Sequence, residues 1–288
     1  MKGIWLSGEA LRAVWSQLPY SEEPFAEWVW WETQDLPWGA VVVEEKGTPI
    51  AAIPLAQRQI GPFQLCRQPL SIPYLPVLLR EPLPSRLSER YRVIGHILSA
   101  FGAWARRKRL SYIAGSLSHT WSYLPPLSPF EVRGHGSFVL YPGEFSPSRE
   151  LLRKVRQASN LSLQLLSPLE GFEWWASHRP AGVSPKLVQQ LRPLMKLRQI
   201  WHVVGVGDPL QAIGLFLIGR HRVWYMAGAH KGQGQAGTRL LYEAITWAHE
   251  KGWEFDFQGS VIPSIERFFR QFGGRWERRY HISAWRIW

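Results

Sequence analysis

Cysteine is almost absent from this sequence, since Cys66 is the only one among 288 residues. A single thiol forms no disulfide within the chain and is too few for a cysteine-rich metal site, and the nine His show no metal-ligand spacing. Long apolar runs are missing too, because none approaches the ~20 residues of a membrane-spanning helix. Glu9 and Arg12 interrupt the N-terminal segment, which has no signal-peptide core. These absences predict a metal-free chain with no transmembrane segment, and a reducing cytoplasm as its compartment.

Acidic residues are few relative to basic ones, 22 against 34, and the net charge is +12. This balance favours a partner that carries phosphates, such as tRNA, a nucleotide cofactor, a lipid headgroup or an anionic membrane surface. Basic segments at 106–109, 149–156 and 267–279 form either one electropositive face or separate solvated faces. The 17 Trp are unusually many, and we expect most of them in the core or at domain contacts.

The stretch from 210 to 274 has the clearest pattern in the chain. Apolar runs at 212–218 and 223–229 predict two strands joined by a tight turn. A Gly-rich loop follows, and then a helix for which Thr238 is the expected N-cap. A short strand at 253–257 comes next. The order strand, strand, loop, helix, strand is typical of an α/β unit.

The sequence of this helix and of the segments after it resembles a known family. Residues 240–252 read LLYEAITWAHEKG, residues 256–259 read DFQG, and Phe268, Phe272 and Gly273 follow. These motifs resemble the C-terminal signature of the FemABX-like branch of the GNAT acyltransferase superfamily, over about the last third of the chain. One position departs from the pattern, because Phe269 stands where the family has Lys.

A fainter repeat lies in the first half of the chain. A predicted hairpin at 40–55 precedes a predicted helix at 87–106, a strand and Gly115-Ser116, as the later hairpin and helix precede Gly259-Ser260. Together with the resemblance, this repeat implies an α/β fold of tandem GNAT-like domains, with mixed central sheets flanked by helices. We expect the domains at 1–145 and 146–288.

The Gly-rich loop is the expected cofactor site. In GNAT folds the loop before this helix offers backbone N–H groups to the cofactor pyrophosphate, aided by the positive end of the helix. Lys231-x-x-Gly234-x-Ala236 partly matches the acetyl-CoA pattern, and a plain flexible loop is the alternative. The expected cofactor-binding residues are Lys231, Gly232, Gln233, Gly234, Gly237 and Thr238.

Acyl transfer to an amine needs a held donor carbonyl, an unprotonated amine and stabilisation of the developing charge. The candidates for these catalytic roles are Asp256, Tyr225, His230 and Arg270. The candidates for substrate binding are Arg267, Glu266 and Ser260. Each has a structural alternative: Asp256 also suits a turn or cap, and Glu266 beside Arg267 also suits a surface ion pair.

Two functions follow from the resemblance. The first is an N-acyltransferase that moves an acyl or aminoacyl group from acyl-CoA or aminoacyl-tRNA to an amine. Its acceptor would be a small molecule or a lipid-linked cell-wall precursor, with tRNA and peripheral membrane contact as partners. The second is a catalytically inactive GNAT-like module that binds an anionic partner, because Phe269 cannot replace the family Lys. An open cleft lined by Asp256, Tyr225 and an Arg favours the enzyme, and a cleft plugged by Phe269 or Trp favours the module.

Overall fold

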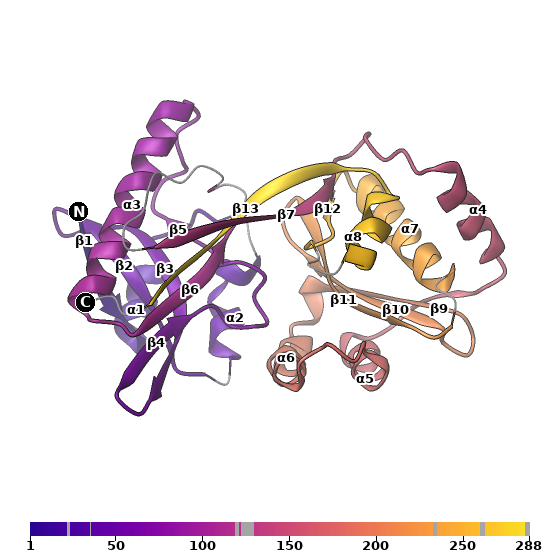
Figure 1. The fold of residues 1–288 in the computed structure, drawn as a ribbon, viewed down its shortest axis with the longest axis horizontal. Coiled ribbons are helices and arrows are strands. Elements are labelled where there is room, and N and C mark those ends of the chain that lie inside the picture. The colour runs from indigo at the N-terminus through magenta and orange to yellow at the C-terminus, as the bar shows by residue number, and fades with distance from the viewer. Residues whose placement is uncertain are drawn as a thin grey trace. The chain divides into compact units, whose positions relative to one another are not determined.

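The computed structural model describes residues 1–21, 24–34, 36–118, 121, 130–232, 235–259 and 263–285. The chain divides into two compact units (Figure 1). Unit 1 comprises Met1–His135 and Arg278–Trp288, and unit 2 comprises Gly136–Glu277. The sequence placed the domain boundary at 145/146, and it gave no sign that the last strand returns to the first unit.

Unit 1 is a mixed sheet with one long helix. Its strands are β1 (Lys2–Leu6), β2 (Trp38–Glu45), β3 (Thr48–Ile60), β4 (Phe63–Arg67), β5 (Leu78–Leu79), β6 (Tyr112–Leu117) and most of β13 (Arg275–Trp285). Its helices are α1 (Gly8–Trp15), η1 (Pro24–Ala26), α2 (Trp28–Glu32) and α3 (Leu87–Arg107). The strand order is β1-β2-β3-β4-β6-β13, with β5 paired to β3.

Unit 2 repeats this plan. Its strands are β7 (Glu131–Leu140, from residue 136), β8 (Leu163–Leu165), β9 (Trp201–Val206), β10 (Ala212–Ile218), β11 (Arg222–His230) and β12 (Glu254–Asp256). Its helices are α4 (Arg149–Gln157), α5 (Pro168–His178), α6 (Pro185–Leu191), η3 (Arg192–Lys196), η4 (Arg198–Ile200), α7 (Gln235–Glu250) and α8 (Pro263–Arg270). The strand order, β8-β9-β10-β11-β12-β7, has the same sequence of pairings as unit 1: only β4–β6 and β11–β12 are parallel.

The last strand of each repeat is exchanged. β7 follows β6 in the chain but pairs with β12 in unit 2, and β13 follows β12 but pairs with β6 in unit 1. The internal repeat expected from the sequence is therefore present, and the exchange explains why local patterns placed the domain boundary differently.

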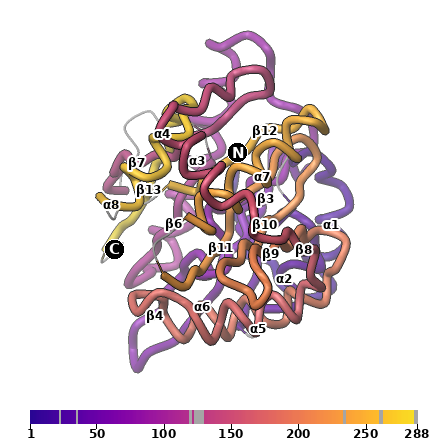
Figure 2. Tube along the Cα trace, turned by 90° about the vertical axis from the view of Figure 1, so that its right-hand side faces the viewer, coloured from indigo at the N-terminus to yellow at the C-terminus, as the bar shows by residue number. Residues whose placement is uncertain are grey.

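The core of unit 2 lies on both faces of its sheet. Leu240, Leu241 and Ala244 of α7 pack on one face with Val204 and Phe216. Figures 1 and 2 show α5 and α6 on the opposite face. There Gly171 of α5 fits against Val203, because a Cβ at Gly171 would lie 2.3 Å from the Val203 side chain.

The strands expected at 212–218 and 223–229 and the helix expected after them are present, but the start of the helix differs. The N-cap prediction for Thr238 is wrong, because α7 begins at Gln235 and Thr238 is a buried residue of its first turn. Ala236 packs in the core, so burial extends the helix beyond the polar residue that resembled a cap. The sequence analysis also missed α5, although Ser167 caps it and Pro168 opens it. Within the described ranges, none of the helices combines the length and apolar character that crossing a bilayer requires.

The single thiol yields a test of the unit 1 core. Cys66 lies in β4, and burial raises its pKa to about 12. We therefore expect a thiol reagent at pH 8 to leave the native protein unmodified while it modifies the urea-unfolded chain completely. A Leu165→Cys variant, at a residue with 77% exposure, should react at once and serves as the control. Fast reaction of Cys66 in native buffer would contradict the packing of β4.

Candidate functional site

Two neighbouring strands of unit 2 separate part-way along their length. β11 and β12 pair in parallel only at Arg222–Glu254, Val223–Phe255 and Trp224–Asp256. On its other side β11 stays paired with β10, where a bulge at Met226 shifts the register. β12 ends at Asp256, and Phe257 donates its backbone N–H to Phe138 of β7. Among the described strands, β11 therefore has one open backbone edge from Tyr225 to His230.

A cavity of about 880 Å³ lies at this opening. The walls come from β11, α4, α7, α8, the end of α5 and the segment after β12. No Trp is among the described lining residues, so the space is not plugged by indole rings. Its position at the first turn of α7 and its size suit a ligand of the dimensions of a cofactor.

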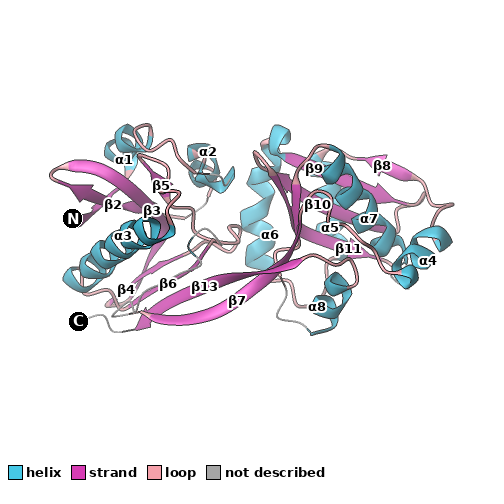
Figure 3. Ribbon diagram, turned by 90° about the horizontal axis from the view of Figure 1, so that it is seen from above, coloured by secondary structure: helices cyan, strands magenta, loops and turns pink. Residues whose placement is uncertain are grey.

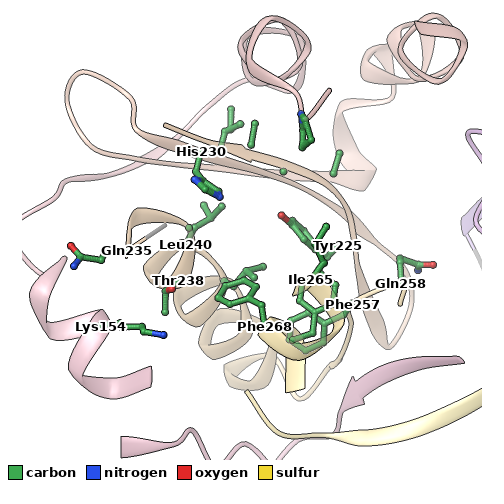
Figure 4. A pocket seen from close by; sticks show the side chains of 18 of the residues that line it. Lys154, Tyr225, His230, Gln235, Thr238, Leu240, Phe257, Gln258, Ile265 and Phe268 are labelled. Atoms are coloured by element: carbon green, nitrogen blue, oxygen red, sulfur yellow. The ribbon is translucent and has the colours of Figure 1, made fainter. Parts of the chain in front are cut away.

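Tyr225 and His230 point into the cavity from the same strand (Figure 4). A Cβ at Gly228 would lie 1.9 Å from the Tyr225 hydroxyl, so only Gly allows this position of the ring. Phe216 and Phe269 border the ring, and burial raises the Tyr225 pKa well above its ordinary value. The hydroxyl is thus protonated at neutral pH and can donate a hydrogen bond. His230 is exposed at the other end of the strand.

Cations border the cavity on the α4 side. Arg153 and Lys154 line it, and Lys154 also forms a 2.9 Å ion pair with Glu150. Arg239 of α7 fixes α4 by donating to the Ala158 and Leu161 carbonyls at 2.5 and 2.6 Å. From the sequence, residues 149–156 were expected only as a basic segment, and no local pattern placed them at the cavity.

The residues of the expected cofactor loop lie in different places. Gly237 and Thr238 line the cavity. The Lys231 ammonium lies 5.3 Å from the centroid of the Trp174 ring, and Gly232 has a positive φ of 78°. Gln233 and Gly234 lie outside the described residues, as does the substrate-binding candidate Ser260.

Asp256 is completely buried beside the cavity and is not part of its lining. Its carboxylate accepts hydrogen bonds from the Ser137 hydroxyl at 2.7 Å and from the Gln258 backbone N–H at 2.8 Å. Both Gln258 and Gly259 line the cavity, and both have positive φ, 63° and 70°. Asp256 therefore holds the wall of the cavity in a turn that a non-Gly residue rarely adopts.

Arg222 links Asp256 to two further carboxylates. Its guanidinium lies 2.5 Å from Glu254, 3.3 Å from Asp256 and 3.0 Å from Glu277. Tyr141 donates a hydrogen bond to Glu277, and burial and this bond raise the Tyr141 pKa. No sequence signal joins these residues, because they lie on four separate segments.

The charged residues of α8 are directed away from the cavity lining. Arg270 pairs with Glu266 at 2.5 Å, and the Arg270 guanidinium lies over the Phe138 ring. Arg267 is exposed. Phe269, in place of the family Lys, is buried in the cavity wall and stacks on Phe257 with a centroid distance of 4.7 Å. Of the described lining residues, the Lys and Arg side chains come from α4 and none comes from α8.

In unit 1 the matching opening is filled. β4 and β6 also pair at three positions, from Leu65–Tyr112 to Arg67–Ala114. Beyond them, the Gln68 side chain accepts from the Ser116 N–H at 2.6 Å, and Leu75 donates its N–H to the Ser116 carbonyl. Leu75 also covers Gly115, where a Cβ would lie 2.2 Å from its side chain. The candidate site is therefore in unit 2.

Comparison with known proteins identifies this architecture. No protein-family model and no curated protein matches the chain. Solved structures do: FemX is 12% identical over 98% of this chain and 97% of its own, with a TM-score of 0.62. The chain has the tandem GNAT fold. The L-PGS of Bacillus licheniformis has a TM-score of 0.56 at 10% identity, covering 96% of this chain and 92% of its own. A tandem GNAT protein from the clavulanic acid biosynthesis pathway has a TM-score of 0.53 at 14% identity, covering 99% and 98%. The expected α/β class and the resemblance to FemABX-like and GNAT structures are confirmed for the fold.

The Arg222 cluster yields a stability prediction. Arg222→Met leaves the carboxylates of Glu254, Asp256 and Glu277 without their shared cation, and we expect a loss of about 3–5 kcal/mol in the free energy of unfolding. The matched control is Arg192→Met, which removes an exposed ion pair with Glu173 and should cost less than about 1 kcal/mol. Urea unfolding followed by circular dichroism measures both. Equal stability of the two variants would contradict the structural role of Arg222.

Proposed function

We propose that this protein transfers an acyl or aminoacyl group to an amine, with the donor bound in the cavity between β11 and α7. The observation that carries the proposal is the open cavity at the parted strands β11 and β12, in a fold shared with FemX and tandem GNAT structures. The donor is acyl-CoA or aminoacyl-tRNA, as the sequence resemblance implies. The similar structure from the clavulanic acid biosynthesis pathway is a tandem GNAT protein without AcCoA, and the naming of AcCoA for that protein favours the first donor.

The open edge of β11 suits the donor arm. Backbone N–H and C=O groups from Tyr225 to His230 can pair with the amide groups of an extended arm, as an added strand would. Donor phosphates would lie at the first turn of α7, near Lys154 and Arg153, where the helix dipole and the cations stabilise negative charge. We assign Lys231, Gly232, Gln233, Gly234, Gly237 and Thr238 to this side.

The chemistry uses the two polar groups of β11. The amine nitrogen forms a bond to the donor carbonyl carbon, and the bond to sulfur or to the tRNA ester oxygen breaks. Tyr225 donates a hydrogen bond to the developing oxyanion, and its raised pKa keeps this proton in place. His230 accepts the proton that the amine loses and passes it to the leaving sulfur or ester oxygen, so that the CoA thiol or the tRNA hydroxyl is released. Asp256 is a positioning residue that acts through Gln258 and Gly259.

The acceptor is a small-molecule or lipid-linked amine that approaches from the α8 side. We assign Glu266, Arg267 and Arg270 to it, because α8 borders the cavity and its charged residues face solvent, and Ser260 is proposed with them from the sequence alone. Arg270 must leave Glu266 to reach the reacting atoms. Both donors occur in the cytoplasm, which we propose as the compartment.

One observation favours a second function, a binding module without catalysis. Phe269 fills the position of the family Lys and is fixed between Phe257 and Tyr225. The cavity wall therefore lacks the cation that the resemblance implies for stabilising charge. Donor binding without any turnover would support the module.

Gly237 provides a test of donor binding. A Cβ at Gly237 would lie 3.5 Å from the His230 ring, an ordinary contact, whereas a longer side chain enters the cavity. We expect titration calorimetry to show saturable micromolar binding of acetyl-CoA to the native protein and to Gly237→Ala, and at least tenfold weaker binding to Gly237→Leu. No heat with the folded native protein would reject acyl-CoA as the donor and direct the same comparison to aminoacyl-tRNA. Equal binding to Gly237→Ala and Gly237→Leu would place the ligand outside this cavity.

Tyr225→Phe tests the chemical step. Removal of one hydrogen-bond donor to an oxyanion lowers turnover about 10²-fold. We expect kcat for release of the CoA thiol in the presence of amine acceptors to fall by that factor with little change in KM. The control is Tyr242→Phe, since Tyr242 lies on α7 against Phe145 and outside the cavity lining. An unchanged kcat in Tyr225→Phe would remove Tyr225 from the mechanism.

A further inference from the structure

One end of the unit 1 sheet combines exposed apolar side chains with a dense positive charge. Three segments meet there: the hairpin tip 58–63 between β3 and β4, the turn 106–111 after α3, and the end of β13 at Trp285. The strand registers fix their proximity. Leu65 pairs with Tyr112, Tyr112 pairs with Trp285, and Ser111 donates its N–H to the Gln64 carbonyl. Figure 3 shows the ends of α3 and β13 and the start of β6 together near the C label. We call this surface the basic rim.

The apolar part of the basic rim is exposed. Ile60 is 46% exposed, Phe63 52% and Trp285 70%. Ile60 and Phe63 are a directly opposed pair at the hairpin tip. The Trp285 ring lies against Tyr112, tilted by 35°, with a centroid distance of 4.1 Å. Exposed aliphatic and aromatic side chains grouped at one edge are typical of an interaction surface.

The charged part of the basic rim has one sign. Arg106 and Arg107 end α3 and Lys108 and Arg109 follow it, all in exposed positions, and Arg58 lies beside the tip. No Asp or Glu occurs in residues 58–67, 96–118 or 278–285, all of which the structure describes. These described ranges therefore contribute cations and no Asp or Glu to this end, which suits an anionic partner.

Arg109 occupies a position that its side chain does not favour. It follows the last turn of α3 with a positive φ of 50°, a conformation in which Gly is the preferred residue. The chain therefore places a cation where Gly would fold better. A binding role for the charge at position 109 would explain why this position holds Arg instead of Gly.

We propose that the basic rim docks the protein on an anionic lipid bilayer. Ile60 and Phe63 at the tip would enter the boundary between headgroups and acyl chains, Trp285 and Tyr112 would lie at the headgroup level, and the cations would contact anionic headgroups. A nucleic acid fits this surface less well, because Ile60 at the tip has no ring for base stacking and Trp285 already covers the Tyr112 ring, whereas Ile60 and Phe63 together suit the apolar boundary of a bilayer. The inference concerns unit 1 and does not depend on the transferase proposal for unit 2.

Sedimentation with vesicles tests the proposal on the full chain. We expect binding to phosphatidylcholine vesicles that contain phosphatidylglycerol, loss of binding in high salt, and no binding to pure phosphatidylcholine. The double variant Ile60→Ser, Phe63→Ser should bind at least tenfold more weakly. Its control is Leu165→Ser, Leu169→Ser, which changes two exposed leucines of unit 2 and should bind like the native protein. No binding at low salt, or an equal loss in the control, would overturn the proposal.

A pair of Gly substitutions separates binding from stability. Arg109→Gly and Lys46→Gly each remove one cation of unit 1 from a positive-φ position, 50° and 51°. Both should raise resistance to urea, but only Arg109→Gly should weaken vesicle binding, by about fivefold for one headgroup contact. Equal vesicle binding of the two variants would contradict the role of Arg109. If neither substitution changed vesicle binding and Arg109→Gly weakened the binding of an RNA oligonucleotide, the partner of the basic rim would be a nucleic acid and the membrane proposal would be overturned.

A probe can report the orientation directly. Because Cys66 is buried, a polarity-sensitive dye on Phe63→Cys labels one site. Its emission should shift to the blue on anionic vesicles, whereas the same dye on Leu165→Cys should not shift. A shift at Leu165 alone would assign the docking surface to unit 2 and overturn the proposal.

Discussion

The candidate site depends on the parting of β11 and β12 after three residue pairs. If β12 continued beside β11, the backbone edge from Tyr225 onward would be satisfied by a strand and no cavity would exist. Two features keep the strands apart: the bulge at Met226, and the buried network in which Asp256 directs the chain after β12 toward β7. Arg222 makes this network possible by sharing one cation among three carboxylates. Burying such a cluster costs desolvation energy, so its value lies in fixing one geometry.

Duplication gave the chain two copies of this parting, and the copies differ in what occupies it. In unit 1, Gln68 and Leu75 satisfy and cover the backbone that β4 leaves open. In unit 2 it is β11 that continues past the last pair, and its edge borders an open cavity. The Pro-rich segment after β4 supplies the filling residues, and it has no equivalent after β11, where the chain passes through a short loop into α7. A single fold plan thus yields one closed and one open unit.

The elements that could be predicted from the sequence are the strands and helices that the local spacing of apolar residues determines. The strands around Gly219, the long helix α3 and the helix α7 follow from apolar spacing, and so does the repeat of the unit. Tyr225 and His230 were candidates from the sequence, and the structure has both on β11 and in the lining of one cavity, while their catalytic roles stay predictions. The exchange of β7 and β13, the bulge at Met226 and the Arg222 network join residues far apart in the chain, which no local pattern reports. The start of α7 was also mispredicted for this reason, because core packing of Ala236, rather than a local cap at Thr238, determines where the helix begins.

The net charge of +12 is distributed over surfaces with different physical consequences. At the cavity, Lys154 already has Glu150 and Gln271 as neighbours, so its cation acts at short range on a ligand that reaches it. On the basic rim the described residues 58–67, 96–118 and 278–285 include no Asp or Glu, and the field of the cations extends over about a Debye length, ~8 Å at physiological salt. Salt should therefore weaken the attraction of an anionic partner to the basic rim far more than the contact of Lys154 with a ligand in the cavity. Because a solvated basic surface needs no exposed Phe or Trp beside it, the side chains of Phe63 and Trp285, rather than the charge, distinguish a docking surface from a merely soluble one.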